Sequence, residues 1–255
     1  MATITPTPIG SDFSKALFNF LKTPGVEGFE PFVYDDSQGI PTLGVGYALV
    51  VNVGGVWKIR NDPTDITNYL TQFANNGIKL TDAQLKTLKD QLQLAADDLN
   101  AAGPVATTDS FPGWYPGLPD SANFLGWTIT DEQALSLFKA VLPKYLSTVK
   151  TWLGNDTLYT SLQGSQEMMV LTSLAYNGYF GAGKSPALHK AIVDDGNRAE
   201  AWYEIRYNTP ATNIIRNYAQ AALFGLYDPG VVTEPEAIQV YQMFGSSGKS
   251  YGEMR

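Results

Sequence analysis

The chain has 255 residues, 44% of them apolar, so it is long enough and apolar enough to bury one large core. Its 17 basic and 25 acidic residues leave a formal net charge of −8 at pH 7, and this acidity without a basic patch argues against nucleic-acid binding. With no cysteine and a single histidine, His189, the chain excludes disulfides, a multi-histidine zinc site and a credible histidine-based triad.

The N-terminal part of the chain predicts a tail, a helix and a hairpin. Residues 1–11 are expected to be an N-terminal tail, and Asp12 then caps a stripe of apolar residues at helical spacing. Apolar and polar residues alternate on both sides of the segment 36–39, which is rich in turn formers. We therefore expect an antiparallel hairpin over residues 32–45.

Two capping boxes frame a long loop in the middle of the chain. Thr81–Gln84 predicts the start of one helix and Thr130–Gln133 the start of another. Residues 103–126, between them, hold four prolines, four glycines and several aromatic residues, which is typical of a long ordered loop. The aromatic side chains of this loop either stack on sugars or simply pin the loop to the body; we favour the second interpretation.

The C-terminal part of the chain predicts further helices. Ser165 is expected to cap a strongly apolar helix, and Ser185-Pro186 and Thr209-Pro210 are typical of helix starts. Gly196 and Gly225 are expected to end helices. The fold class predicted from these patterns is α+β and mostly helical, with one domain over residues 12–255 and a mobile end from about residue 245.

The candidate catalytic residues stand close together in the sequence at Glu27, Asp36 and Thr42. Cleavage of an acetal between sugars needs one carboxylic acid to protonate the leaving oxygen and a second carboxylate to activate water or attack the anomeric carbon. The predicted hairpin holds Asp36 near its tip and returns Thr42 beside it. Glu27 precedes the first strand, so we expect it to face Asp36 across a cleft, as paired carboxylates do in glycosidases.

The two carboxyl groups are expected to differ in protonation. A half-buried Glu27 would have a raised pKa and stay protonated, whereas Asp36 in a polar, hydrogen-bonded turn would stay ionised. Other interpretations of these residues stay open. An isolated acid is usually a solvated surface group, Thr42 can be only a β-branched strand residue, and Glu30 or Asp35 replaces a member of the pair if the register is wrong by one residue.

The pattern of Glu, eight residues, Asp, five residues and Thr resembles the catalytic signature of the phage-type lysozymes, glycoside hydrolase family 24. Glycines at the flanking positions agree in register, namely Gly28, Gly39, Gly44 and Gly46. Weaker similarity continues through residues 130–138, 174–177 and 199–207, and the resemblance covers about two thirds of the chain. It leaves out the tails and residues 48–126, which would be an insertion that is atypical of the family.

The resemblance implies a two-lobed lysozyme-like fold, with a small hairpin lobe and a larger helical lobe on either side of the cleft. It implies hydrolysis of the β-1,4 bond between N-acetylmuramic acid and N-acetylglucosamine in peptidoglycan. Glu27 would be the general acid, Asp36 the second carboxylate and Thr42 the hydroxyl that places water. The substrate-binding residues that it implies are Tyr176, Asn177 and, by a looser alignment, Arg216.

The sequence departs from the family at two points. Tyr47 stands where a histidine is usual, and Pro24-Gly25 interrupts the helix that normally runs into the glutamate. The first departure puts in question the structural contact that the histidine makes in the family. The second puts in question the angle at which Glu27 approaches the cleft.

The expected partner is bacterial peptidoglycan, and the chain is expected to be a monomer without cofactor, metal or membrane insertion. Because the start of the sequence lacks a basic segment and an apolar stretch, we expect synthesis in the cytoplasm without a signal peptide. The enzyme would then reach the periplasm or cell wall through a phage holin, as an endolysin, or by injection from a secretion machine, as a toxin effector. Two alternatives stay open: a catalytically silent peptidoglycan-binding protein, and a chitin-type glycosidase.

The acidic residues are unevenly distributed. Between Asp90 and Phe138 there are seven acids and no Lys or Arg, which leaves 17 basic and 18 acidic residues elsewhere. This segment overlaps the part that the resemblance does not explain. One hypothesis is that it faces a basic partner such as an immunity protein; the simpler one, which we favour, is a solvated insertion.

Overall fold

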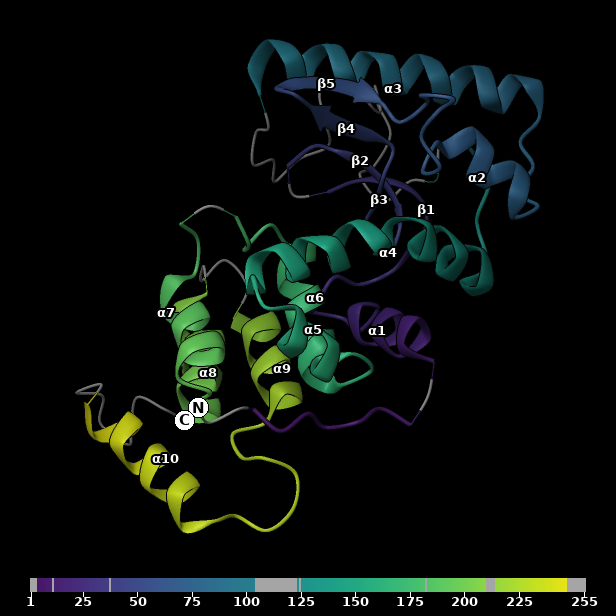
Figure 1. Cartoon of the computed structure of the whole chain (residues 1–255). Helices are drawn as coiled ribbons and strands as arrows, with labels where there is room; N and C mark the ends of the chain where they lie inside the picture. Colours follow the sequence, from purple (N-terminus) through teal and green to yellow (C-terminus); the bar gives the residue numbers. More distant parts are fainter. Residues whose placement is uncertain are drawn as a thin grey trace. The chain divides into compact units, whose positions relative to one another are not determined.

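Figure 1 shows the computed structural model of the chain, which describes residues 4–10, 12–36, 38–103, 123, 125–181, 183–209 and 214–246. The described residues form a mixed α and β structure that is mostly helical, as predicted. They group into two compact units, a helical unit of residues 1–21 and 143–255 and a sheet-bearing unit of residues 22–142. None of the helices within the described ranges is both long and apolar enough to cross a membrane.

The sheet-bearing unit contains the predicted hairpin. Strands β1 (Glu30–Asp35), β2 (Pro41–Gly44) and β3 (Tyr47–Ala48) form an antiparallel sheet in that order. Tyr34 lies directly opposite Thr42, and the register between β1 and β2 shifts near the start of β1. All four residues of β2 are buried, a property that the alternating sequence did not indicate. The reason is that β2 is the central strand and is covered by other parts of its unit.

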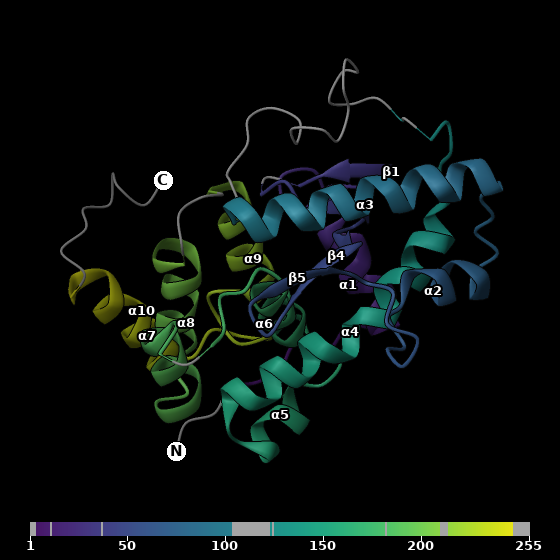
Figure 2. The ribbon, with the colours of Figure 1, turned by 90° about the horizontal axis from the view of Figure 1, so that it is seen from above.

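The part of residues 48–126 that the structure describes is a second hairpin with two helices. Strands β4 (Val50–Val53) and β5 (Val56–Ile59) pair with each other, and α2 (Tyr69–Asn75) and α3 (Asp82–Ala102) follow. Helix α3 runs along β5, as Figures 1 and 2 both show. The side chain of Asn100 fixes this contact by bonding both the N–H and the C=O of Trp57. The loop expected over 103–126 falls almost entirely outside the described residues.

Both capping boxes are confirmed. Thr81 and Gln84 exchange side-chain and backbone hydrogen bonds at the start of α3. Thr130 and Gln133 do the same at the start of α4 (Asp131–Leu153). Helix α4 continues through Pro143 as one element, so the proline does not end it.

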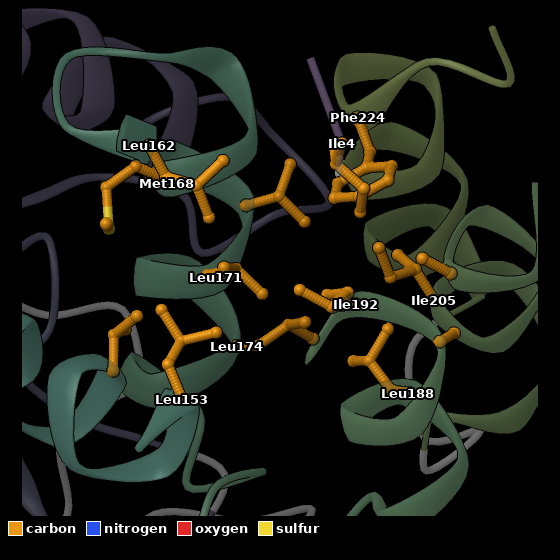
Figure 3. Close-up of a cluster of buried hydrophobic side chains, with 14 of the residues drawn as sticks. Ile4, Leu153, Leu162, Met168, Leu171, Leu174, Leu188, Ile192, Ile205 and Phe224 are labelled. Atoms are coloured by element: carbon orange, nitrogen blue, oxygen red, sulfur yellow. The ribbon is translucent and has the colours of Figure 1, made fainter. Parts of the chain in front are cut away.

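The helical unit contains the remaining elements. In chain order these are α1 (Phe13–Leu21), the second part of α4, α5 (Asp156–Leu162), α6 (Gln166–Tyr176), α7 (Pro186–His189), the π-helix η1 (Lys190–Asp194), α8 (Arg198–Tyr203), the π-helix η2 (Glu204–Asn208), α9 (Ile214–Phe224) and α10 (Glu234–Ser246). Helix α6 lies at the centre, since nearly all of its residues are buried. Its Leu171 and Leu174 point towards Leu188, Ile192 and Ile205 in the core cluster of Figure 3.

A buried ion cluster ties distant segments of the helical unit together. The Arg198 guanidinium donates to Glu167 Oε1 and to Asp228 Oδ1, each at 2.6 Å, and Glu167 and Arg198 are 0% and 4% exposed. Arg198 also donates to the carbonyl oxygen of Thr5, and Glu167 accepts from the N–H and the hydroxyl of Thr7. The segment expected to be a tail is therefore held against the core from Ile4 onwards.

The predicted helix ends are mostly, but not entirely, correct. Asp12 and Ser165 accept backbone hydrogen bonds at the starts of α1 and α6, as predicted. Gly196 and Gly225 adopt the left-handed conformation beyond helix ends. Ser185 is an exception, because its backbone has φ of 51° and its hydroxyl donates to the Tyr179 carbonyl oxygen instead of capping α7.

Candidate active site

Glu27 lies in a turn of the sheet-bearing unit. Helix α1 ends at Leu21 and the segment with Pro24 and Gly25 forms turns, so Glu27 does not stand at a helix end. Gly25 and Gly28, on either side of Glu27, have φ of 86° and 83°, a backbone conformation that glycine adopts without strain. The side chain of Glu27 is partly exposed, with Oε1 buried.

Asp36 organises the turn between β1 and β2. Its Oδ1 accepts hydrogen bonds from the N–H groups of Gln38 at 2.8 Å and Ile40 at 2.9 Å, which closes the turn around the carboxyl group. Burial raises the pKa of Asp36 above its usual value, and these two hydrogen bonds oppose the rise without cancelling it. The hydrogen bonds were expected, but the expectation that the turn would leave this carboxyl readily ionised did not take its burial into account.

Thr42 is 2% exposed and belongs to the central strand. Its hydroxyl donates to the carbonyl oxygen of Ile40 at 2.8 Å, inside the same turn that Asp36 closes. Because this bond uses the hydroxyl proton, any water that Thr42 places would have to donate to the hydroxyl oxygen.

Tyr34 is a residue of this site that sequence reasoning missed. Burial is the main cause that raises the pKa of its hydroxyl, and the negative charges of Asp36, Glu27 and Glu30 raise it further. Glu27 and Asp36 are therefore both within electrostatic reach of one hydroxyl group. A signal was present in the sequence, since Tyr34 belongs to the predicted strand that leads into the turn of Asp36.

The two alternative acids have different surroundings. Glu30 is exposed at the start of β1, and its charge also acts on Tyr34. Asp35 pairs with Pro41 at the end of the strand, and one of its oxygens, Oδ1, is buried. Successive residues of a strand point to opposite faces, so Asp35 projects away from the face that carries Tyr34.

The three residues expected to bind substrate lie in the helical unit. Asn177 caps the end of α6, where its Nδ2 donates to the Ser173 carbonyl oxygen at 2.8 Å. Its Oδ1 accepts a hydrogen bond from the guanidinium of Arg216, so the structure brings these two predicted residues together. Tyr176 packs its ring against Tyr145, with the ring centroids 4.6 Å apart.

Behind Asn177 lies a buried polar contact between α6 and α9. Gln220 and Ser173 are both fully buried, and Gln220 Nε2 donates to Ser173 Oγ at 2.8 Å. Ser173 therefore uses its carbonyl group to hold Asn177 and its hydroxyl group to hold Gln220. This contact fixes the end of α6 that presents Asn177.

The helical unit also has a surface hollow of about 630 Å³, which is lined by Ser147, Thr148, Thr151, Trp152, Gly181, Gly183, Lys184, Pro186 and His189. Trp152 stacks on Phe180 with ring centroids 3.9 Å apart, and His189 meets the indole edge to face. Since no carboxyl group is among these described lining residues, the hollow does not provide the acid pair that glycoside hydrolysis requires. In the described ranges, no group of three or more His, Cys, Asp or Glu residues is placed to hold a metal ion.

The sheet-bearing unit holds two of the candidate acids and the candidate hydroxyl. The charges of Glu27 and Asp36 both raise the pKa of the Tyr34 hydroxyl. Ile40, in the turn that Asp36 closes, also accepts the hydrogen bond of the Thr42 hydroxyl. Hydrolysis of an acetal needs two carboxyl groups near one bond. No protein-family model matches this chain, and no curated protein matches it.

Proposed function

We propose that this chain is a peptidoglycan hydrolase, a muramidase that cleaves the β-1,4 bond between N-acetylmuramic acid and N-acetylglucosamine. The observation that carries the proposal is the turn after β1, in which the Asp36 carboxyl group accepts from Ile40 and the Thr42 hydroxyl donates to the same residue. The charges of Asp36 and of Glu27 both act on the phenol of Tyr34, in the strand before that turn. Two acids separated by eight residues in the sequence share one neighbourhood, as a carboxylate-pair mechanism requires. The resemblance to the phage-type lysozymes supplies the substrate class and the lysozyme-like fold as parts of the same proposal.

In this mechanism Glu27 protonates the glycosidic oxygen as the sugar bond breaks. Asp36 either activates a water molecule that displaces the leaving sugar, with inversion, or attacks the anomeric carbon to form a glycosyl-enzyme ester, which water then hydrolyses with net retention. Thr42 contributes its hydroxyl oxygen as an acceptor for that water. Asn177 and Arg216 are proposed to bind the glycan, with Tyr176 beside them.

The proposed partner is the murein of a bacterial cell wall. The enzyme would reach it by holin-mediated release or by injection from a secretion machine, and an immunity protein would be the cognate partner in the second case. The two routes place the same chemistry in different biological settings.

The direct test is to incubate the purified chain with peptidoglycan sacculi and to analyse the soluble products by mass spectrometry. We expect muropeptides that end in reducing N-acetylmuramic acid. Chitin oligomers assayed in parallel distinguish the chitin-type glycosidase, and sacculi that retain the protein without releasing fragments indicate a silent binding protein. Intact sacculi after long incubation would rule out the muramidase.

Replacement of the proposed acid gives a sharper test. Glu27→Gln keeps the shape of the side chain but removes the proton donor, so turnover should fall by about 10²- to 10⁴-fold while binding to sacculi persists. Glu132→Gln is the matched control, because Glu132 is an exposed glutamate of the same unit. If Glu27→Gln keeps most of the wild-type rate, the acid is another residue.

A further inference from the structure

The hollow of the helical unit has the size and the lining of a ligand site. Its volume of about 630 Å³ lies within the range of pockets that hold small molecules, roughly 300–1,000 Å³. Such pockets combine apolar walls with a few polar groups that fix the orientation of the ligand. Here Trp152 and Pro186 supply apolar surface, and three residues of α4 supply hydroxyl groups, namely Ser147, Thr148 and Thr151. None of these side chains has a part in the proposed hydrolysis.

The aromatic wall of the hollow is held in place from behind. The indole of Trp152 stacks on Phe180, which is 7% exposed, with the ring planes 10° apart. His189 meets the same indole at an interplanar angle of 86°. Trp152 itself is only partly buried, so part of its side chain lines the hollow. An aromatic ring fixed in this way offers a preformed apolar surface to the C–H groups of a sugar ring.

The hollow carries a positive charge in an acidic chain. Lys184 is the one Lys, Arg, Asp or Glu among the described lining residues, whereas the whole chain has a net charge of −8. Its Nζ donates to the carbonyl oxygen of Gly178 at 2.9 Å, and a lysine ammonium has two further N–H donors. The hydroxyl of Thr148 donates to the Lys144 carbonyl oxygen at 3.1 Å, so its oxygen can accept. These groups suit a ligand that combines hydroxyl or amide groups with a carboxylate.

The hollow adjoins the residues proposed to bind glycan. Lys184 bonds the carbonyl oxygen of the residue that directly follows Asn177. On α4, Tyr145 and Trp152 are seven residues apart, so they lie on one side of the helix and about 10 Å apart along its axis. Tyr145 packs against Tyr176, and Trp152 lines the hollow. One side of α4 therefore leads from the proposed glycan-binding residues to the hollow.

We propose that the hollow is an additional glycan-binding site, which holds an N-acetylmuramic acid unit of murein. The sugar ring lies against Trp152, its hydroxyl and amide groups bond the hydroxyls of α4, and its lactyl carboxylate bonds Lys184. N-acetylglucosamine has no carboxylate, so the site distinguishes the two sugars of one polymer by their charge. The inference rests on the proposed function for the identity of the polymer, but binding can be measured without turnover.

The single histidine of the chain is an unambiguous probe of this site. His189 lines the hollow, so the NMR signals of its imidazole protons report what enters it. The full chain is titrated with the disaccharide of N-acetylglucosamine and N-acetylmuramic acid and, in parallel, with chitobiose, which lacks the carboxylate. We expect a saturable shift of the His189 signals and a Kd about 3- to 10-fold lower for the murein disaccharide. No saturable shift, or equal Kd values, overturns the proposal.

Removal of its charge tests the role of Lys184. Lys184→Gln keeps a donor for the backbone carbonyl group but loses the ammonium charge, so the preference for the murein disaccharide should disappear. Lys89→Gln is the matched control, because Lys89 is an exposed lysine on α3 in the other unit and its replacement changes the net charge equally. A preference that persists in Lys184→Gln refutes the assignment.

A charge of opposite sign tests the position of the sugar. Thr151→Glu places a carboxylate among the hydroxyls of the hollow and should weaken binding of the murein disaccharide by at least about 10-fold through like-charge repulsion. Thr157→Glu is the control, because Thr157 is exposed on α5 and is not among the described residues that line the hollow. Undiminished binding in Thr151→Glu would place the disaccharide elsewhere and overturn the proposal.

Failure of this site and failure of the muramidase give different results. A saturable His189 shift together with sacculi that stay intact would refute the muramidase alone. Release of muropeptides by a chain whose His189 signals do not respond to the disaccharide would refute this binding site alone.

Discussion

At the scale of single residues, the carboxyl group of Asp36 shows how a local motif and its surroundings oppose each other. Its two backbone hydrogen bonds favour the ionised form, and burial disfavours it more strongly. A carboxyl whose pKa is higher in the folded than in the unfolded chain destabilises the fold once the pH rises through that folded pKa. At a pH below the pKa of the carboxyl group in the unfolded chain, this loss of folding stability is absent.

Asp36→Asn should consequently stabilise the protein at neutral pH, whereas under the proposed mechanism it should abolish turnover. The amide oxygen can still accept from Gln38 and Ile40, and the buried charge is gone. We expect the Tm at pH 7 to rise by about 1–3 °C and the gain to shrink as the pH falls into the range where wild-type Asp36 is protonated. Differential scanning calorimetry at several pH values measures both effects.

The comparison for this variant is Asp62→Asn in the same unit. Hydrogen bonds from Thr64 are the main reason that the pKa of Asp62 lies below its usual value, so its ionised form is favoured by the fold. Its replacement should produce no gain in Tm at neutral pH. A gain of equal size in both variants would mean that removing any negative charge from this acidic chain has the same effect.

At the scale of secondary structure elements, Gly44 sets how closely β2 approaches the elements that cover it. It ends β2 with φ of 68°, and a Cβ atom there would lie 3.3 Å from the Cβ of Ala134 on α4 and 3.4 Å from Ile129. Both the backbone conformation and the close contact therefore select glycine. The glycine that the family resemblance singled out has a structural reason that is independent of catalysis.

Gly44→Ala should destabilise the sheet-bearing unit by about 1–3 kcal/mol, because the strain of a left-handed alanine adds to the contact with α4. Chemical denaturation monitored by circular dichroism measures this loss. Gly54→Ala is the control that isolates the contact, since Gly54 has φ of 63° but no atom within 4 Å of an added Cβ. Equal losses in the two variants would show that only the backbone conformation matters.

At the scale of the whole molecule, the ion cluster of Glu167, Arg198 and Asp228 joins parts of the chain that are far apart in sequence. Breaking a buried pair by removing one partner leaves an uncompensated charge, which typically costs 3–5 kcal/mol. Glu167 would be left in that state, fully buried, if Arg198 were removed. The N-terminal segment would lose its bond to Arg198 at the same time.

Arg198→Met should thus destabilise the helical unit by about 3–5 kcal/mol, as measured by denaturant unfolding. The double variant Glu167→Met with Arg198→Met should recover part of this loss, because the fully buried charge of Glu167 is removed and the remaining acid, Asp228, is 30% exposed to water. The exposed pair Lys86–Asp90 provides the control, and Lys86→Met should change stability little. A small effect of Arg198→Met alone would show that water reaches Glu167 and compensates its charge.

The sequence by itself determined the features whose physics is local. The capping boxes at Thr81 and Thr130 and the hairpin that carries Asp36 depend on atoms only a few residues apart, and the structure confirms each of them. The candidate acids Glu27 and Asp36 were also found by local spacing. Such features can be predicted from the sequence because the hydrogen-bonding groups of caps and tight turns find their partners in neighbouring backbone groups.

Only the tertiary structure decided how these residues are surrounded. The burial of Asp36 and the burial of all four residues of β2 arise when other segments cover them. The cluster around Arg198 joins positions that no periodic sequence pattern relates. The hydroxyl of Ser185 donates to the Tyr179 carbonyl oxygen instead of capping the helix that follows it. Solvation and long-range contacts depend on segments that are distant in the sequence. For that reason the sequence indicated two candidate acids but not the environment that sets their protonation.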